Sequence, residues 1–111
     1  MISSDVIRGH IDTIILNLLL EKDRYGYELA NVIKDRSQQL FNIKEATLYS
    51  VLQRLETKEL IVSYFGEKSH GGKRRYYQIT SLGKAYLIEM VKEWKVLKQI
   101  MQMMIGVQDN E

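Results

Sequence analysis

Residues 44–80, KEATLYSVLQRLETKELIVSYFGEKSHGGKRRYYQIT, decide the fold of this chain. The first part of the stretch has apolar residues at offsets 0, 3, 4 and 7, the spacing that places side chains on one face of an α-helix. These residues are Leu48, Val51, Leu52 and Leu55. The second part holds two runs rich in Ile, Val, Tyr and Phe, at 60–66 and 74–80, around a segment with Gly71-Gly72. The stretch therefore predicts a helix over 44–58 followed by a two-stranded hairpin.

Helical patterns also lie on both sides of this stretch. Residues 5–21 predict a first helix, 22–24 a connector, and 26–37 a short second helix. A long last helix begins after Thr80, a good cap, and ends at Gly106. Three helices, a hairpin and a further helix form the winged helix-turn-helix pattern, a mainly α fold of the α+β class.

The composition is that of one ordinary globular domain. The chain has 111 residues, of which 45% are hydrophobic and 27% charged, and its net charge is only +2. It has no cysteine, which excludes disulfides and thiolate metal sites and is typical of the reducing cytosol. No signal-peptide start is present, and the apolar run 14–20 is far shorter than the roughly 20 residues that cross a bilayer. We therefore expect a bacterial cytoplasmic protein.

The outward face of the helix over 44–58 is polar but scarcely charged. Small and polar side chains allow a helix to approach base edges closely, and amide, guanidinium and hydroxyl groups match the donors and acceptors of the major groove. The residues predicted to contact DNA from this helix are Ala46, Thr47, Tyr49, Ser50, Gln53 and Arg54. Tyr49 lies at the border of the face, so it is either a DNA contact or a rim residue that packs on the fold.

The hairpin supplies the charge that the helix lacks. Lys73, Arg74 and Arg75 follow the glycine turn directly and are predicted to contact phosphates, which position a protein on DNA without specifying a sequence. Taken alone, such a run of cations is as often just a solvated face. We expect a DNA-binding winged-helix domain over residues 1–80.

The last helix has an apolar seam that so small a domain cannot cover. Its members step by four, three, three, four and three, as in a coiled coil, and they are Leu87, Val91, Trp94, Leu97, Met101 and Met104. The first helix is also apolar on more than one side. We therefore expect residues 81–106 to be a dimerisation helix, followed by a disordered tail over 107–111. The predicted dimer interface consists of Ile7, Ile11, Leu87, Val91, Trp94, Met101 and Met104.

Three blocks in this order resemble the PadR family of bacterial transcriptional regulators. They are Tyr25-Gly26-Tyr27-Glu28-Leu29, then Ala46-Thr47-Leu48-Tyr49 with Arg54-Leu55-Glu56, and finally residues 71–80, GGKRRYYQIT. The resemblance covers residues 8–101. It departs from the family at Glu59, where relatives usually have glycine after the recognition helix, so this residue must adopt a left-handed conformation or end the helix differently. Tyr25 and Tyr27 are expected to fix the second helix against the core.

The single C-terminal helix is similar to that of the small PadR subfamily, whose members dimerise through this helix and the first one. Some of them bind flat apolar drugs at the interface, against a stacking tryptophan. The resemblance implies a ligand pocket of Thr13, Asn17, Val91, Trp94, Leu97, Lys98 and Met101. A basic Lys98 leaves an anionic or neutral aromatic as plausible as a cation. From the residues alone, Trp94 and its Met neighbours fit a plain dimer core equally well.

The pattern as a whole predicts a homodimeric repressor that binds an inverted repeat in duplex DNA and is relieved by an apolar or aromatic ligand. The alternative is a winged-helix protein-interaction adaptor, since a fold does not settle a function. No enzyme is expected, because the chain has no phosphate-binding glycine loop and no clear catalytic triad. No cofactor and no metal are expected either, because His10 and His70 lie far apart without ligand spacing.

Overall fold

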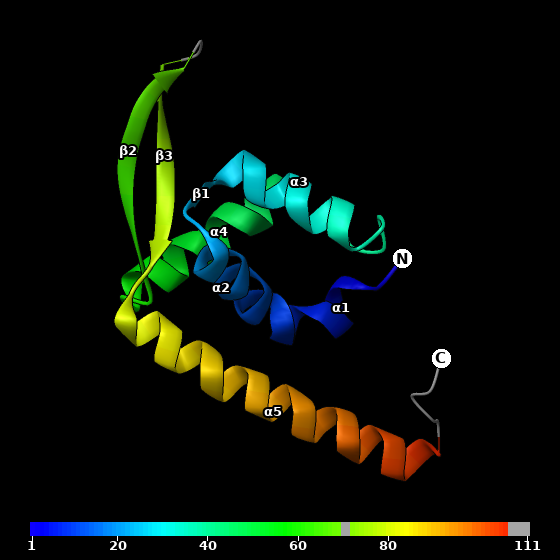
Figure 1. Cartoon of the computed structure of the whole chain (residues 1–111). Helices are drawn as coiled ribbons and strands as arrows, with labels where there is room; N and C mark the ends of the chain where they lie inside the picture. The colour runs from blue at the N-terminus through cyan, green and yellow to red at the C-terminus, as the bar shows by residue number, and fades with distance from the viewer. Residues whose placement is uncertain (70–71, 107–111) are drawn as a thin grey trace.

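The computed structural model describes residues 1–69 and 72–106. Its helices are α1 (Ser4–Ile7), the 3-10 turn η1 (Arg8–His10), α2 (Ile11–Glu21), α3 (Gly26–Arg36), α4 (Glu45–Thr57) and α5 (Ser81–Ile105). Its strands are β1 (Arg24–Tyr25), β2 (Ile61–Ser69) and β3 (Gly72–Ile79). The β2–β3 hairpin, the wing, projects beyond the helices at one end of the molecule, and α5 runs along the opposite side (Figure 1). The winged-helix prediction is confirmed, and the predicted tail over 107–111 lies outside the described residues.

The core lies between α2, α3, α4 and the base of the wing. The predicted inner stripe of α4 is buried in it, together with Ile15 and Leu16 of α2, Leu29 of α3 and Ile61 of β2. Because the stripe faces inward, the remaining side of α4 points away from the core. Within the described residues no helix is long and apolar enough to cross a membrane.

The sheet has a third strand that the sequence analysis missed. Arg24 and Tyr25 pair antiparallel with Tyr77 and Tyr76, which gives the strand order β1-β3-β2. The prediction of a plain connector over 22–24 was therefore wrong at Arg24, because a two-residue strand has no periodicity to detect. The Arg24 side chain is buried, and its guanidinium donates to the Leu18 carbonyl and to two glutamates, Glu21 and Glu28.

The first predicted helix is not continuous. A 3-10 turn at Arg8–His10 separates the short α1 from α2. Gly9 lies in this turn, where a glycine costs about 1 kcal/mol of helix stability relative to alanine. The break sets α1 apart as a separate piece beside α4.

Local backbone and capping rules explain how α4 ends before the wing and how α5 begins and ends after it. Glu59 takes the left-handed conformation, with φ of 62°, so the first of the two predicted outcomes holds. The Leu60 N–H donates to the Leu55 carbonyl and the Glu59 N–H to the Glu56 carbonyl, which together form a Schellman motif at the end of α4. As predicted, Thr80 caps α5, accepting from the Gly83 N–H at 2.9 Å. Gly106 ends α5 with φ of 69°.

Candidate nucleic-acid interface

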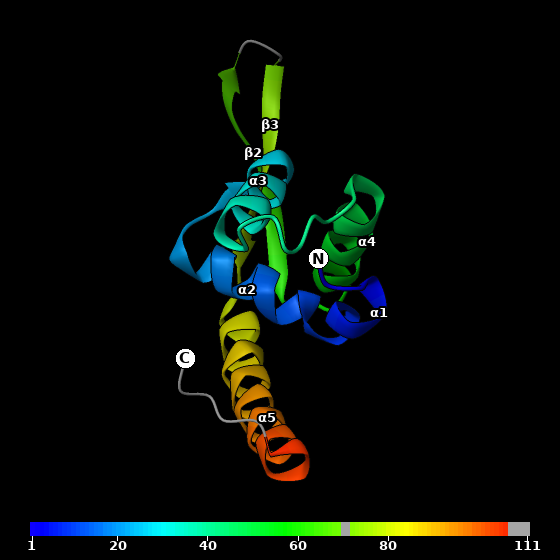
Figure 2. The same cartoon turned by 90° about the vertical axis from the view of Figure 1, so that its right-hand side faces the viewer.

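The outer face of α4 is open along its length. All six residues predicted on it are exposed: Ala46, Thr47, Tyr49, Ser50, Gln53 and Arg54. We call these six residues the reading face. Figure 2 shows α4 on the same side of the molecule as α1, with the wing above and α5 below. An α-helix whose exposed side chains are small and polar fits into the major groove of DNA.

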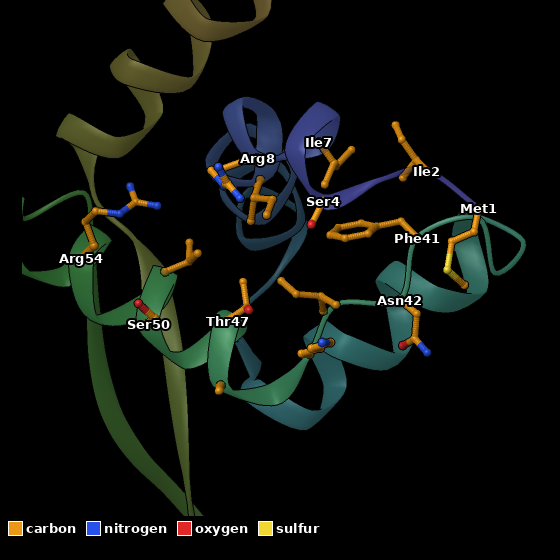
Figure 3. A pocket seen from close by; sticks show the side chains of 15 residues that line it. Met1, Ile2, Ser4, Ile7, Arg8, Phe41, Asn42, Thr47, Ser50 and Arg54 are labelled. Atoms are coloured by element: carbon orange, nitrogen blue, oxygen red, sulfur yellow. The ribbon is translucent and has the colours of Figure 1, made fainter.

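A groove of about 650 Å³ runs along one edge of the reading face, between α4 and α1. Thr47 and Arg54 stand on its α4 side, and Ile7 and Arg8 on the opposite side (Figure 3). Phe41 is among the side chains that line its apolar part. The reading face is thus bordered by a hollow and is not packed against α1.

Tyr49 is divided between the fold and the solvent. Its ring is 44% exposed, yet its hydroxyl end lies against Gly26 at the start of α3, where any Cβ would collide with it. The two alternatives for Tyr49 are therefore compatible, since one end of the ring packs on the fold and the other remains open. A side chain at position 26 would therefore force the Tyr49 ring to shift.

Arg54 does not point freely outward. Its two terminal nitrogens donate to the two carboxylate oxygens of Asp12 in α2, at 2.7 and 2.8 Å. The Arg54 side chain is 45% exposed and that of Asp12 only 15%. The hydrogen bond to Asp12 raises the pKa of Arg54 above its ordinary value. No local pattern in the sequence pointed to Asp12, which lies 42 residues away.

The three cations of the wing do not form one surface. Because β3 begins at Gly72 and not at Arg74, all three lie within a strand, where successive side chains point to opposite faces. The Arg74 guanidinium lies 4.3 Å from the centre of the Tyr25 ring. On the opposite face, Arg75 donates to Ser63 and to Glu56 of α4. The three cations predicted to contact phosphates therefore lie on two faces of the wing, with Lys73 and Arg75 on one and Arg74 on the other.

An aromatic cluster, also missed from the sequence, braces the base of the wing. The Tyr76 ring meets Tyr25 edge-on at 5.6 Å and stacks on Tyr64 at 5.8 Å. The Tyr64 hydroxyl donates to Asp23 at 2.6 Å, and this hydrogen bond raises the pKa of Tyr64. Tyr25 is thus structural as expected, although through the sheet. Tyr27 is 68% exposed, so its predicted packing against the core was wrong.

Comparison with known proteins agrees with this geometry. The family model of the PadR-like transcriptional regulators matches residues 15–89. The chain belongs to the PadR-like family. It is accordingly a DNA-binding transcriptional regulator and not an enzyme.

Individual relatives of this PadR-like regulator cover most of the chain. An uncharacterized protein of Lysinibacillus sphaericus is 62% identical over 103 residues, 93% of this chain and 94% of that protein. The structure of a transcriptional regulator from Clostridium thermocellum is 46% identical and matches with a TM-score of 0.87, covering 95% of this chain and 99% of that one. Bacillus subtilis PadR, solved with operator DNA, shares the fold at 22% identity and a TM-score of 0.67, over 74% of this chain and 46% of its own.

Away from the reading face, this PadR-like chain has an apolar pocket of about 400 Å³ between its N-terminal segment and α5. Of the predicted ligand residues, it brings together Thr13 and Trp94; its other lining residues are Ile2, Val6, Ile7, His10 and Ile14. The Lys98 ammonium lies 5.5 Å from the centre of the Trp94 ring. The other five predicted residues, Asn17, Val91, Leu97, Lys98 and Met101, do not line this pocket within one chain.

Two residues of the predicted dimer interface are buried within the single chain. Ile11 and Leu87 are only 6% and 4% exposed, because each packs in the chain's own core. They have almost no surface to offer a partner. The rest of the predicted seam is open, with Val91 half-buried and Trp94, Leu97, Met101 and Met104 between 41% and 75% exposed. Ile7 is half-buried and lines both the groove and the apolar pocket.

Proposed function

We propose that this PadR-like regulator is a homodimeric repressor that places α4 of each subunit in successive major grooves of an inverted repeat. The two copies of α4 would then lie about 34 Å apart along the DNA. The observation that carries the proposal is the reading face of α4, which is polar and exposed, with Arg75 of the wing hydrogen-bonded to Glu56 near the end of the same helix. The operator complex of Bacillus subtilis PadR supports it through a shared fold.

Dimerisation is supported by the surface of α5 beyond Val91. Trp94, Leu97, Met101 and Met104 continue a coiled-coil spacing, and all are exposed in a single chain. Exposed apolar side chains in such a run mark an interaction surface. A second copy of the same helix, with Val6 and Ile7 of α1, would bury them symmetrically.

A ligand response is supported by the apolar pocket beside Trp94. Its volume of about 400 Å³ is in the range of small-molecule sites, and its walls are nearly all apolar. An aromatic ligand stacked on Trp94 would act at the junction of α1, α2 and α5. If it changes the angle between subunits, the two reading faces lose their spacing on DNA and transcription resumes.

The experiment that tests DNA binding is selection of bound fragments from the source genome, followed by titration of the recovered operator at several salt concentrations. We expect an inverted repeat, and an affinity that falls steeply with salt because phosphate contacts release counterions. A protein that binds no duplex in a salt-sensitive way would contradict the proposal and favour a protein-interaction adaptor. Since the proposed partner is chromosomal DNA, we place the protein in the bacterial cytoplasm.

A further inference from the structure

We infer that Arg54 is a positioning residue that sets the orientation of α4 through Asp12 and does not itself read a base. The inference rests on the proposed function, in which α4 enters the major groove. It separates Arg54 from the other members of the reading face, which have no comparable partner among the hydrogen bonds and ion pairs of the described residues.

The geometry of the pair favours a fixed link. Both terminal nitrogens of Arg54 engage both oxygens of Asp12, and a two-pronged pair of this kind fixes direction as well as distance. Asp12 lies in the first turn of α2, and its carboxylate is mostly shielded from water. If Arg54 turned to a base, this carboxylate would lose its two charged hydrogen bonds in a partly dry environment.

The place of the pair in the fold explains why it matters for orientation. Two sets of side-chain hydrogen bonds hold the C-terminal turns of α4. Arg54 donates to Asp12 of α2, and Glu56 accepts from Ser63 and Arg75 of the wing. Along the same edge, from Thr47 to Arg54, the reading face borders the open groove beside α1 (Figure 3). The buried stripe holds α4 in the core, and the Asp12 link fixes the side of the helix that faces the groove, so loss of this link allows α4 to shift on that side. Thr47 and Ser50 would then be displaced from the bases that they face.

Asp12→Asn is the decisive variant, because two explanations predict opposite signs. As a mere negative charge near DNA, Asp12 repels phosphates, so its removal would strengthen binding to every duplex. As the anchor of Arg54, its removal should weaken operator binding about tenfold, a factor that corresponds to about 1.4 kcal/mol, while binding to an unrelated duplex stays the same or rises slightly. Fluorescence anisotropy with the two labelled duplexes measures both. Asp5→Asn is the matched control: among the described residues the ion-pair partner of Asp5 is the exposed Arg8, so this change should leave operator binding unchanged.

Arg54→Lys and Arg54→Gln supply the second arm, read on a set of operators with single base-pair changes. A positioning residue lowers the affinity for the whole set by a common factor, and the double variant Asp12→Asn/Arg54→Gln loses no more than Arg54→Gln alone. A base-reading residue would instead relax preference at one base pair, with Asp12→Asn silent, and that pattern would overturn the inference. Circular dichroism checks that each variant is folded. If Asp12→Asn does not fold, Arg54→Lys, which retains the positive charge, replaces it as the test of the pair. Failure of the wild-type chain to bind any operator would refute the proposed function itself, which is a different result.

Discussion

Replacing Glu59 with glycine should stabilise this protein. Glu59 occupies the left-handed position that ends α4, with φ of 62°. A residue with a Cβ costs about 1–2 kcal/mol in this conformation, whereas glycine adopts it freely. Against this, glycine loses about 0.5–1 kcal/mol more conformational entropy on folding. The net gain is about 0.5–1 kcal/mol, which should raise the melting temperature by about 2–6 °C in a domain of this size.

The hydrogen bonds at this turn should survive the change, because none of them uses the Glu59 side chain. Its N–H donates to the Glu56 carbonyl, and its carbonyl accepts from the Thr80 hydroxyl at 2.8 Å. Thermal unfolding by circular dichroism at one fixed protomer concentration is the appropriate assay, because dimer formation makes melting depend on concentration. Lys58→Gly is the matched control: Lys58 has φ of −80°, so glycine brings only its entropic cost and should lower the melting temperature. If Glu59→Gly melted at or below the wild-type temperature, the assignment of strain to this residue would be wrong.

Three further substitutions test other parts of the structure. Gly83→Ala would push a Cβ into the Leu60 carbonyl, so it should lower the free energy of unfolding, measured in urea, by about 1–3 kcal/mol. A neutral effect would mean that α5 does not pack so closely on this turn. Lys73→Ala should weaken binding to all duplexes alike and reduce the slope of log K against log salt by about 1, and an unchanged slope would remove Lys73 from the interface. Trp94→Asp should abolish the dimer in sedimentation while leaving each domain folded. Leu87→Ala should instead lower the free energy of unfolding by about 2–5 kcal/mol, because Leu87 lies in the chain's own core. A dimeric Trp94→Asp variant would exclude this face of α5 as the interface.

The elements that follow local rules could be predicted from the sequence. The inner stripe of α4, the Thr80 cap and the Gly106 stop each depend on residues within a few positions of one another, and all three were found as expected. The exposure of the reading face followed from the same helical periodicity. The break at Arg8–His10 was missed because the apolar spacing continues across it.

What could not be predicted depends on contacts between distant segments. The Asp12–Arg54 pair and the Tyr64–Asp23 hydrogen bond join residues 42 and 41 positions apart, and nothing local marks either partner. The placement of Lys73 in a strand depends on how far the pairing with β2 extends, whereas the opposite directions of Arg74 and Arg75 already follow from the strand predicted over 74–80. Likewise, the apolar spacing along α5 could not tell Leu87, which faces its own core, from Trp94, which does not.

The two halves of α5 therefore differ in what stabilises them. Its 25 residues span about 37 Å at 1.5 Å per residue, and its contacts with the core cluster end at Val91, beyond which Trp94 borders the apolar pocket. A helical segment of about 14 residues beyond Val91 is marginal in water by itself, so its helicity must come from burial of the apolar side chains that follow. Under the proposed dimer, folding of this segment and association are one process. We therefore expect helical content to fall on dilution below the dimer dissociation constant, by about the contribution of these residues, while the winged-helix domain remains folded; helicity independent of concentration down to a proven monomer would contradict this coupling.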